Sequence, residues 1–137
     1  MMTFAEAIRL GSVLRPQAFG DTFGKKKRWF RKPETTSCAL GAAIEAAGVQ
    51  WLPDTGGGTN ITVRGGVSAG MAWMFPPEWN FTSTHELCPM CRVNSTIIGL
   101  IEHLNDYHHW SRQDIAGWVE PVEARLTGAR ACQIKAR

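Results

Sequence analysis

The chain has 137 residues, of which 44% are hydrophobic and 20% are charged, and its formal net charge is +3. A chain of this length suits one domain with a real hydrophobic core. No run of eighteen apolar residues occurs, which argues against a membrane-spanning helix. The first residues lack the basic start and long apolar centre of a signal peptide. We therefore expect a cytoplasmic protein without membrane contact, in a reducing compartment where disulfides are rare.

The first third of the chain predicts two helices separated by a basic loop. The first helix is predicted over residues 3–14, because Thr3 and Glu6 form a capping-box pair ahead of apolar residues at helical spacing. The second helix is predicted over residues 35–47, where small and apolar residues recur on one face. Between them, residues 20–33 predict an exposed basic loop.

This basic loop concentrates positive charge around aromatic residues. Clustered Lys and Arg side chains neutralise phosphates, while aromatic rings stack on exposed bases, a combination that suits single strands or loops of nucleic acid. The alternative is a solvated loop whose aromatic side chains turn into the core. The residues predicted to bind nucleic acid are Lys25, Lys26, Lys27, Arg28, Trp29, Arg31 and Lys32, with Phe30 beside them.

The rest of the chain predicts irregular strands followed by two further helices. Residues 49–84 are punctuated by glycines, which predicts a short hairpin or irregular strands. A third helix is predicted over residues 95–108, and a fourth begins after Ser111, with a kink or a division at Pro121. The basic tail, residues 127–137, is predicted to fray.

Residues 85–110 contain the ligand pattern of a zinc site. Two residues separate Cys88 from Cys91, eleven separate Cys91 from His103, and four separate His103 from His108. A CxxC turn directs two thiolates to one point, and two histidines about one helical turn apart offer two nitrogens from one side. Four protein ligands leave no place for an activated water, so the pattern predicts a structural Zn²⁺ rather than a catalytic one.

Two alternatives to this ligand set remain open at the level of sequence. His109 or His85 takes the place of His108 as the fourth ligand in one of them. In the other, a reduced CxxC turn lies beside a helix that carries surface histidines and binds no metal.

Two resemblances accompany these residues. The pattern that includes a leucine three residues before the first histidine resembles the two-Cys, two-His zinc finger, in which that leucine would pack under the metal. The run from Ile101 to Val119 is similar to small uncharacterised proteins encoded by bacteriophages and prophages, which implies a source and no settled activity. The residues that match the zinc finger are Cys88, Cys91, Leu100, His103 and His108.

Together these patterns predict one mainly helical α+β domain over residues 1–137. It has about four helices and a short Gly-rich hairpin segment, and one structural Zn²⁺ stabilises it. The predicted function is nucleic-acid binding through the basic loop, on a scaffold that zinc holds in place.

A second prediction is a phage-type accessory or virion protein that binds a host or phage protein through tryptophans. Trp73, Phe75, Trp79 and Phe81 alternate around two prolines, and such aromatics form either a lid of the core or a binding surface. An enzyme is not predicted. Cys38 is the one thiol considered as a nucleophile, because the start of a helix lowers a thiol pKa.

Overall fold

The computed structural model describes residues 2–20, 23–28, 31–48 and 75–135. Its elements in chain order are helix α1 (Phe4–Ser12), strands β1 (Phe23–Arg28) and β2 (Arg31–Ser37), helix α2 (Ala39–Ala46), the 3-10 helix η2 (Pro77–Ser83), strands β3 (His85–Leu87) and β4 (Asn94–Thr96), and helices α4 (Ile97–Asp106) and α5 (Arg112–Lys135). Each strand pair forms a separate antiparallel sheet. The described fold is therefore mainly helical, as predicted.

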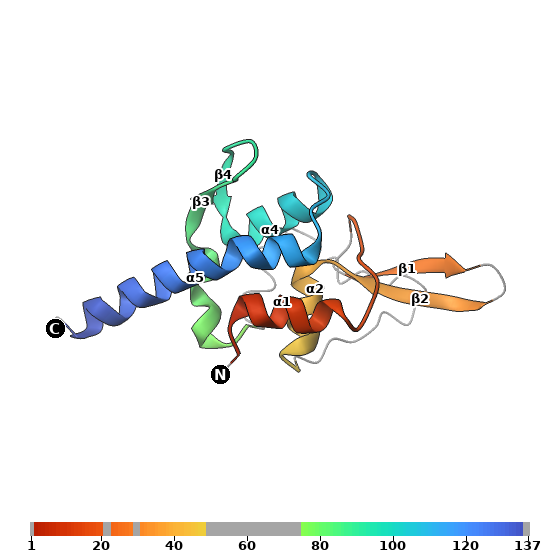
Figure 1. Ribbon diagram of the computed structural model, residues 1–137, viewed down its shortest axis with the longest axis horizontal. Helices are drawn as coiled ribbons and strands as arrows, with labels where there is room; N and C mark the ends of the chain where they lie inside the picture. Colours follow the sequence, from red (N-terminus) through yellow and green to blue (C-terminus); the bar gives the residue numbers. More distant parts are fainter. Residues whose placement is uncertain (1, 21–22, 29–30, 49–74, 136–137) are drawn as a thin grey trace.

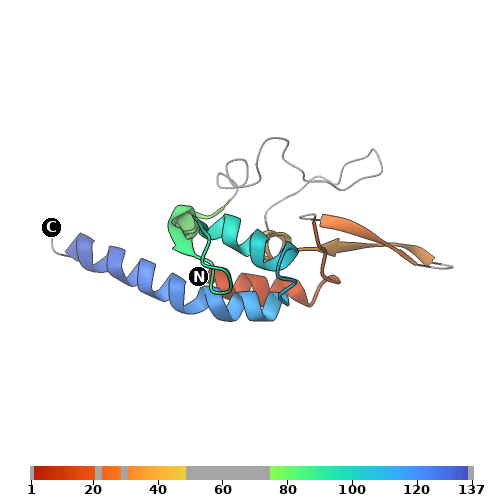
Figure 2. The same cartoon turned by 90° about the horizontal axis from the view of Figure 1, so that it is seen from above.

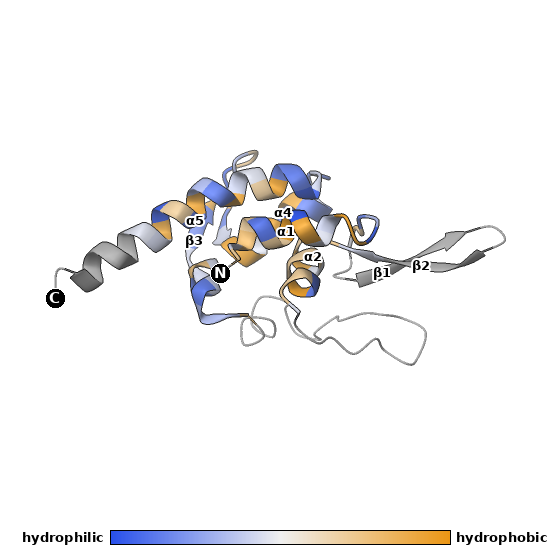
Figure 3. Ribbon diagram, turned by 60° about the horizontal axis from the view of Figure 1, so that its bottom comes forward, coloured by the Kyte–Doolittle hydropathy of each residue, from blue (hydrophilic) through white to orange (hydrophobic). Residues whose placement is uncertain are grey.

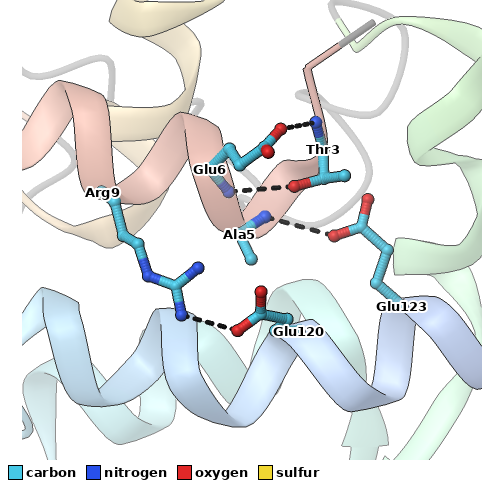
Figure 4. Close-up of polar contacts among 6 residues, drawn as sticks. All are labelled: Thr3, Ala5, Glu6, Arg9, Glu120 and Glu123. Carbon is cyan, nitrogen blue, oxygen red and sulfur yellow. Dashed lines mark hydrogen bonds and ion pairs between the residues drawn. The ribbon is translucent and has the colours of Figure 1, made fainter.

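Helix α1 begins where the sequence predicts. Thr3 Oγ1 accepts the N–H of Glu6 at 3.1 Å, and the Glu6 carboxylate accepts the N–H of Thr3 at 2.8 Å (Figure 4). This reciprocal pair confirms the predicted capping box. Phe4 and Ile8 are fully buried on the predicted face, but the helix ends before Leu14, whose side chain is exposed.

A carboxylate from α5 completes the start of α1. Glu123 accepts the N–H of Phe4 at 2.9 Å. It also accepts the N–H of Ala5 at 3.2 Å, and Arg9 donates to Glu120 at 2.8 Å (Figure 4). The first N–H groups of a helix lack partners within the helix, and its dipole favours a negative charge there. These contacts dock α1 on α5, which no local pattern in the sequence predicted.

Helices α1 and α2 approach each other closely at Gly11. A Cβ atom placed on Gly11 would lie 1.8 Å from the carbonyl oxygen of Ala42. Leu40, Ala43 and Ile44 of α2 are fully buried, as its predicted apolar face requires. The absence of a side chain at Gly11 therefore sets how near the two backbones lie.

The predicted basic loop over residues 20–33 instead forms most of an antiparallel hairpin. Phe23 pairs with Ser37, so α2 begins at Ala39 rather than at residue 35. The prediction of a loop was wrong because charge does not exclude a strand: lysines are common on the edges of exposed strands. The two strands also lack the alternation of apolar and polar residues that usually predicts a strand, so periodicity gave no sign of them.

Most of the predicted Gly-rich hairpin segment, and Trp73 with it, lies outside the described residues. Pro76 and Pro77 are expected to break this segment, and residues 77–83 form the 3-10 helix η2. Phe75, Trp79 and Phe81 are buried, and their ring centroids lie 4.7 to 6.1 Å from that of Phe4. These three aromatic residues belong to the core.

Helices α4 and α5 correspond to the predicted third and fourth helices. Strand β4 precedes α4, so this helix begins at Ile97. Ser111 Oγ accepts the N–H of Asp114 at 3.0 Å, which confirms the predicted start of the last helix. Helix α5 then continues through Pro121 and the predicted frayed tail to Lys135. A proline removes one helical hydrogen bond, but here the helix continues on both sides of it.

Buried Arg112 connects the start of α5 to two earlier segments. Its guanidinium donates to the carbonyl oxygens of Ser37, Ser12 and Arg15 at 2.7 to 3.2 Å. Burial lowers the pKa of this guanidinium from its usual value. These bonds tie the base of the β1–β2 hairpin to the helices.

The arrangement of the elements leaves two projections from a helical body. Figures 1 and 2 both place the β1–β2 hairpin at one end and the C-terminal part of α5 at the other. Hydrophobic residues recur along α1, α2 and α4, whereas α5 alternates between hydrophilic and hydrophobic residues, as a helix lying on the surface of a core does (Figure 3). No helix among the described residues is long and apolar enough to cross a membrane.

Candidate metal centre

The β3–β4 hairpin carries both cysteines of the CxxC motif. Leu87 pairs with Asn94, and the chain reverses between them through a tight turn. In this turn the N–H of Cys88 donates to the carbonyl of Val93 at 2.9 Å, and the N–H of Arg92 donates to the carbonyl of Cys88 at 3.0 Å. The turn therefore holds the two thiols on a fixed backbone.

Helix α4 carries the two histidines. Thr96 caps the helix, with its hydroxyl accepting the N–H of Gly99 at 3.1 Å. His103 lies in the last turn, and His108 follows the helix end, with its N–H donating to the carbonyl of His103 at 3.2 Å. The two imidazole rings meet edge to face, with centroids 4.7 Å apart.

The four predicted ligands meet at one point. The ligand atoms of Cys88, Cys91, His103 and His108 all lie within 4.8 Å of one another. Cys91 Sγ is 3.2 Å from His103 Nε2, and the Nε2 atoms of the two histidines are 3.1 Å apart. A tetrahedral Zn²⁺ with bonds of about 2.0 to 2.3 Å separates its ligand atoms by about 3.3 to 3.8 Å. The four side chains thus lie close enough to hold one metal ion.

The environment favours the protonation states that a metal requires. Burial opposes ionisation of the Cys88 thiol, but hydrogen bonds from Cys91, Met90 and Arg92 together outweigh it and lower its pKa. Burial, and then the neighbouring charge of His108, lower the pKa of His103. A thiolate and a neutral imidazole are the forms that bind metals.

The other two histidines have different neighbours. His85 Nδ1 lies 2.8 Å from Asn94 Oδ1, and the ring of His109 packs against Phe19 with centroids 5.0 Å apart. Of the three histidines considered for the fourth position, His108 is the one that the structure brings together with the cysteines.

The order strand, strand, helix around this cluster is that of the two-Cys, two-His zinc finger. In a DNA-reading finger the helix is free to enter the major groove. Helix α4 is enclosed by the rest of the domain instead, so it is not available for such an insertion. Its buried residues are Ile97, Ile98, Leu100, Ile101, Leu104 and Asn105.

The structure places the basic residues of the predicted nucleic-acid site on both strands of one hairpin. Arg28 pairs with Arg31, and Lys26 pairs with Glu34. Trp29 and Phe30 connect the two strands in the chain and lie outside the described residues. The basic residues of β1 are Lys25, Lys26, Lys27 and Arg28, and those of β2 are Arg31 and Lys32.

Cys38, predicted near the start of the second helix, caps α2, but its thiol is not activated. Its Sγ accepts the N–H of Gly41 at 3.5 Å, and only 4% of the residue is exposed. Burial raises the pKa of Cys38 to about 12. The expectation that the helix start lowers this pKa was wrong, because desolvation outweighs the hydrogen bonds from the backbone. The thiol stays protonated at neutral pH.

Sequence reasoning missed two residues beside the cluster. Arg92, directly after Cys91, has a φ of 60°, in the left-handed region that glycine adopts most easily. Tyr107 stacks on His103, with ring centroids 5.0 Å apart and planes 9° from parallel. A glycine after the second cysteine would have signalled the turn, but the arginine in its place concealed it.

We expect Arg92→Gly to stabilise the protein by about 1 kcal/mol, because glycine removes the strain of a left-handed residue. Chemical unfolding at fixed metal concentration measures the change. Arg92→Ala is the matched control for loss of the side chain, since it keeps the strain. Val93→Gly should destabilise the protein, because the φ of Val93 is not positive and glycine there relieves no strain. Equal stability of Arg92→Gly and Arg92→Ala would contradict the prediction.

Comparisons with known proteins returned no match. No family model matches the chain, and no curated protein or solved structure is significantly similar to it. The zinc-finger resemblance therefore rests on the metal-ligand cluster itself, and the bacteriophage resemblance stays a prediction.

Proposed function

We propose that Cys88, Cys91, His103 and His108 bind one structural Zn²⁺. Two thiolates and two imidazoles are the donor set that zinc prefers in structural sites. They fill a tetrahedron and leave no position for a reacting water. The ion would fasten the β3–β4 hairpin to the end of α4, and its binding energy would add to the free energy of folding.

We further propose that the chain binds nucleic acid through the β1–β2 hairpin. The observation that carries this proposal is the gathering of six of the fifteen basic residues on one two-stranded ribbon that extends from the body (Figures 1 and 2). Lysine and arginine side chains on such a ribbon neutralise backbone phosphates. Trp29 and Phe30, at the connection between the strands, would stack on unpaired bases.

Binding should weaken when the first three lysines of the ribbon are neutralised. We expect the triple variant Lys25→Gln, Lys26→Gln, Lys27→Gln to lose at least about tenfold in affinity at moderate salt. The slope of log affinity against log salt should become shallower by about 2 to 3, because each phosphate contact contributes roughly one unit. Fluorescence anisotropy with labelled single-stranded and duplex oligonucleotides at several salt concentrations measures both quantities.

A second triple variant controls for net charge. Arg9→Gln, Arg92→Gln, Arg125→Gln removes the same charge from exposed or half-exposed sites outside the hairpin. Its affinity should stay within about twofold of the parent chain, since these arginines lie on α1, the metal turn and α5. An equal loss in both triples, or no binding by the parent chain at low salt, would contradict the proposal.

The alternative is a phage-type accessory protein that binds a host or virion protein. Trp79, proposed for that surface, is buried, but Leu87, Met90 and Val93 are exposed together around the β3–β4 turn. Exposed apolar side chains grouped in this way mark protein-binding surfaces. Absence of nucleic-acid binding at low salt, together with weaker partner binding by Met90→Ser, would favour this alternative.

A further inference from the structure

The segment before the β1–β2 hairpin is held rigidly against the end of α4. Fully buried Asn105 donates to the carbonyl of Ala18 at 2.8 Å and accepts from Gln17 at 3.0 Å. The N–H of Gly20 donates to Asp106 Oδ1 at 2.8 Å, and Asn105 donates to the same oxygen at 2.7 Å. These bonds fix the backbone on both sides of residue 19 and engage the carboxylate of Asp106.

Three aromatic rings point outward from this rigid frame. Tyr107 is 70% exposed and Phe19 is 49% exposed, and His109 is exposed beside Phe19 with ring centroids 5.0 Å apart. One face of Tyr107 rests on His103, which fixes the orientation of its ring. Rings held in place before binding lose little conformational entropy when a ligand stacks on them.

Phe19, and with it the His109 ring, lies next to the base of the basic hairpin. Gln17 forms a bridge with Ser37, the last residue of β2, and three residues separate Phe19 from the start of β1. The six-residue distance from Phe19 to Lys25 spans at most about 21 Å. This is about the length of six stacked nucleotides at about 3.4 Å each. One short strand can therefore reach both the lysines and Phe19.

We infer that Phe19, Tyr107 and His109 form a stacking platform for unpaired bases of a DNA or RNA strand whose phosphates contact the β1–β2 hairpin. This inference rests on the proposed function of the hairpin. A platform of this kind binds base faces, which are hidden in a duplex and open in a single strand. It therefore directs the protein to unpaired segments, independently of Trp29 and Phe30.

The test compares single strands with a duplex. The probes are a twelve-residue oligothymidylate, an oligouridylate of the same length and a twelve-base-pair duplex. We expect Phe19→Ala and Tyr107→Ala each to weaken binding of the single strands by about 5- to 150-fold, the range for loss of one stacked base. Duplex binding should be unchanged. Tyr107→Phe, which keeps the ring, should retain the affinity of the parent chain, and the ratio between the two oligonucleotides identifies DNA or RNA as the partner.

Two controls separate this inference from the proposed function. Val13→Ala removes an apolar side chain that is 78% exposed outside the platform, and it should leave all affinities unchanged. Metal content of Tyr107→Ala must equal that of the parent chain, so that loss of affinity is not loss of zinc. If the lysine triple variant weakens binding while Phe19→Ala and Tyr107→Ala do not, the platform is refuted and the hairpin function stands. If the parent chain binds none of the probes, both are refuted.

Discussion

Replacing Cys88 with serine, or His103 with alanine, should abolish tight zinc binding and lower the thermal unfolding temperature by about 10 °C or more. Each change removes one of four ligand atoms that the structure brings within 4.8 Å of one another. The ion would connect a short hairpin to the end of α4, and a three-residue strand pair gains little stability from its own hydrogen bonds. Zinc content by elemental analysis and unfolding by circular dichroism measure the two effects.

The remaining histidines supply the controls for this experiment. His85→Ala and His109→Asn should keep full zinc and near-parent stability, because neither side chain belongs to the cluster; asparagine tolerates the left-handed backbone at residue 109. A chelator should lower the unfolding temperature of the parent chain and leave that of Cys88→Ser unchanged. If His103→Ala keeps its full zinc content, or if the chelator leaves the stability of the parent chain unchanged, this site is not a structural metal centre.

Replacing Gly11 with alanine should destabilise the protein by about 2 to 3 kcal/mol, or about 10 °C, although alanine favours helices. The added Cβ would lie 1.8 Å from the carbonyl oxygen and 2.7 Å from the Cα of Ala42. These are backbone atoms of α2, so no side chain can rotate out of the way. Either α1 and α2 separate, or the buried contacts around Leu40 and Ile8 are lost.

Gly117 provides the matched control for Gly11. It also lies within a helix, but a Cβ placed on it would meet nothing within 4 Å. Gly117→Ala should therefore stabilise the protein by up to about 1 kcal/mol through helix propensity alone. Urea unfolding of both variants gives the two changes with opposite signs. A Gly11→Ala protein as stable as the parent would show that the helices do not pack at this distance.

Local patterns in the sequence predicted the features that depend on residues close together in the chain. Thr3 and Glu6 predicted the start of α1, because a capping box lies within one helical turn. The spacing of the two cysteines and two histidines predicted the metal-ligand cluster, because one hairpin and one helix place all four. For Phe75, Trp79 and Phe81 the sequence left two places open, the core and a binding surface, and the structure buries all three.

Contacts between distant residues decided the remaining features, and no local pattern contains them. The basic hairpin is the exception: its pairing is local, but its strands lack the alternation of apolar and polar residues that predicts a strand. Cys38 lies at the start of a helix, a position that by itself would lower its pKa. Packing around the thiol excludes water, and its pKa is raised instead.

The sequence by itself determined the capped first helix, the buried apolar faces of the helices and the four residues of the candidate zinc site. The tertiary structure alone decided that Glu123 caps α1, that Gly11 brings α1 against α2, and that α4 is enclosed rather than free to read DNA. The physical reason is the range of the interaction. Capping and ligand spacing act within a turn or a hairpin, whereas desolvation and helix contact depend on which distant segments meet.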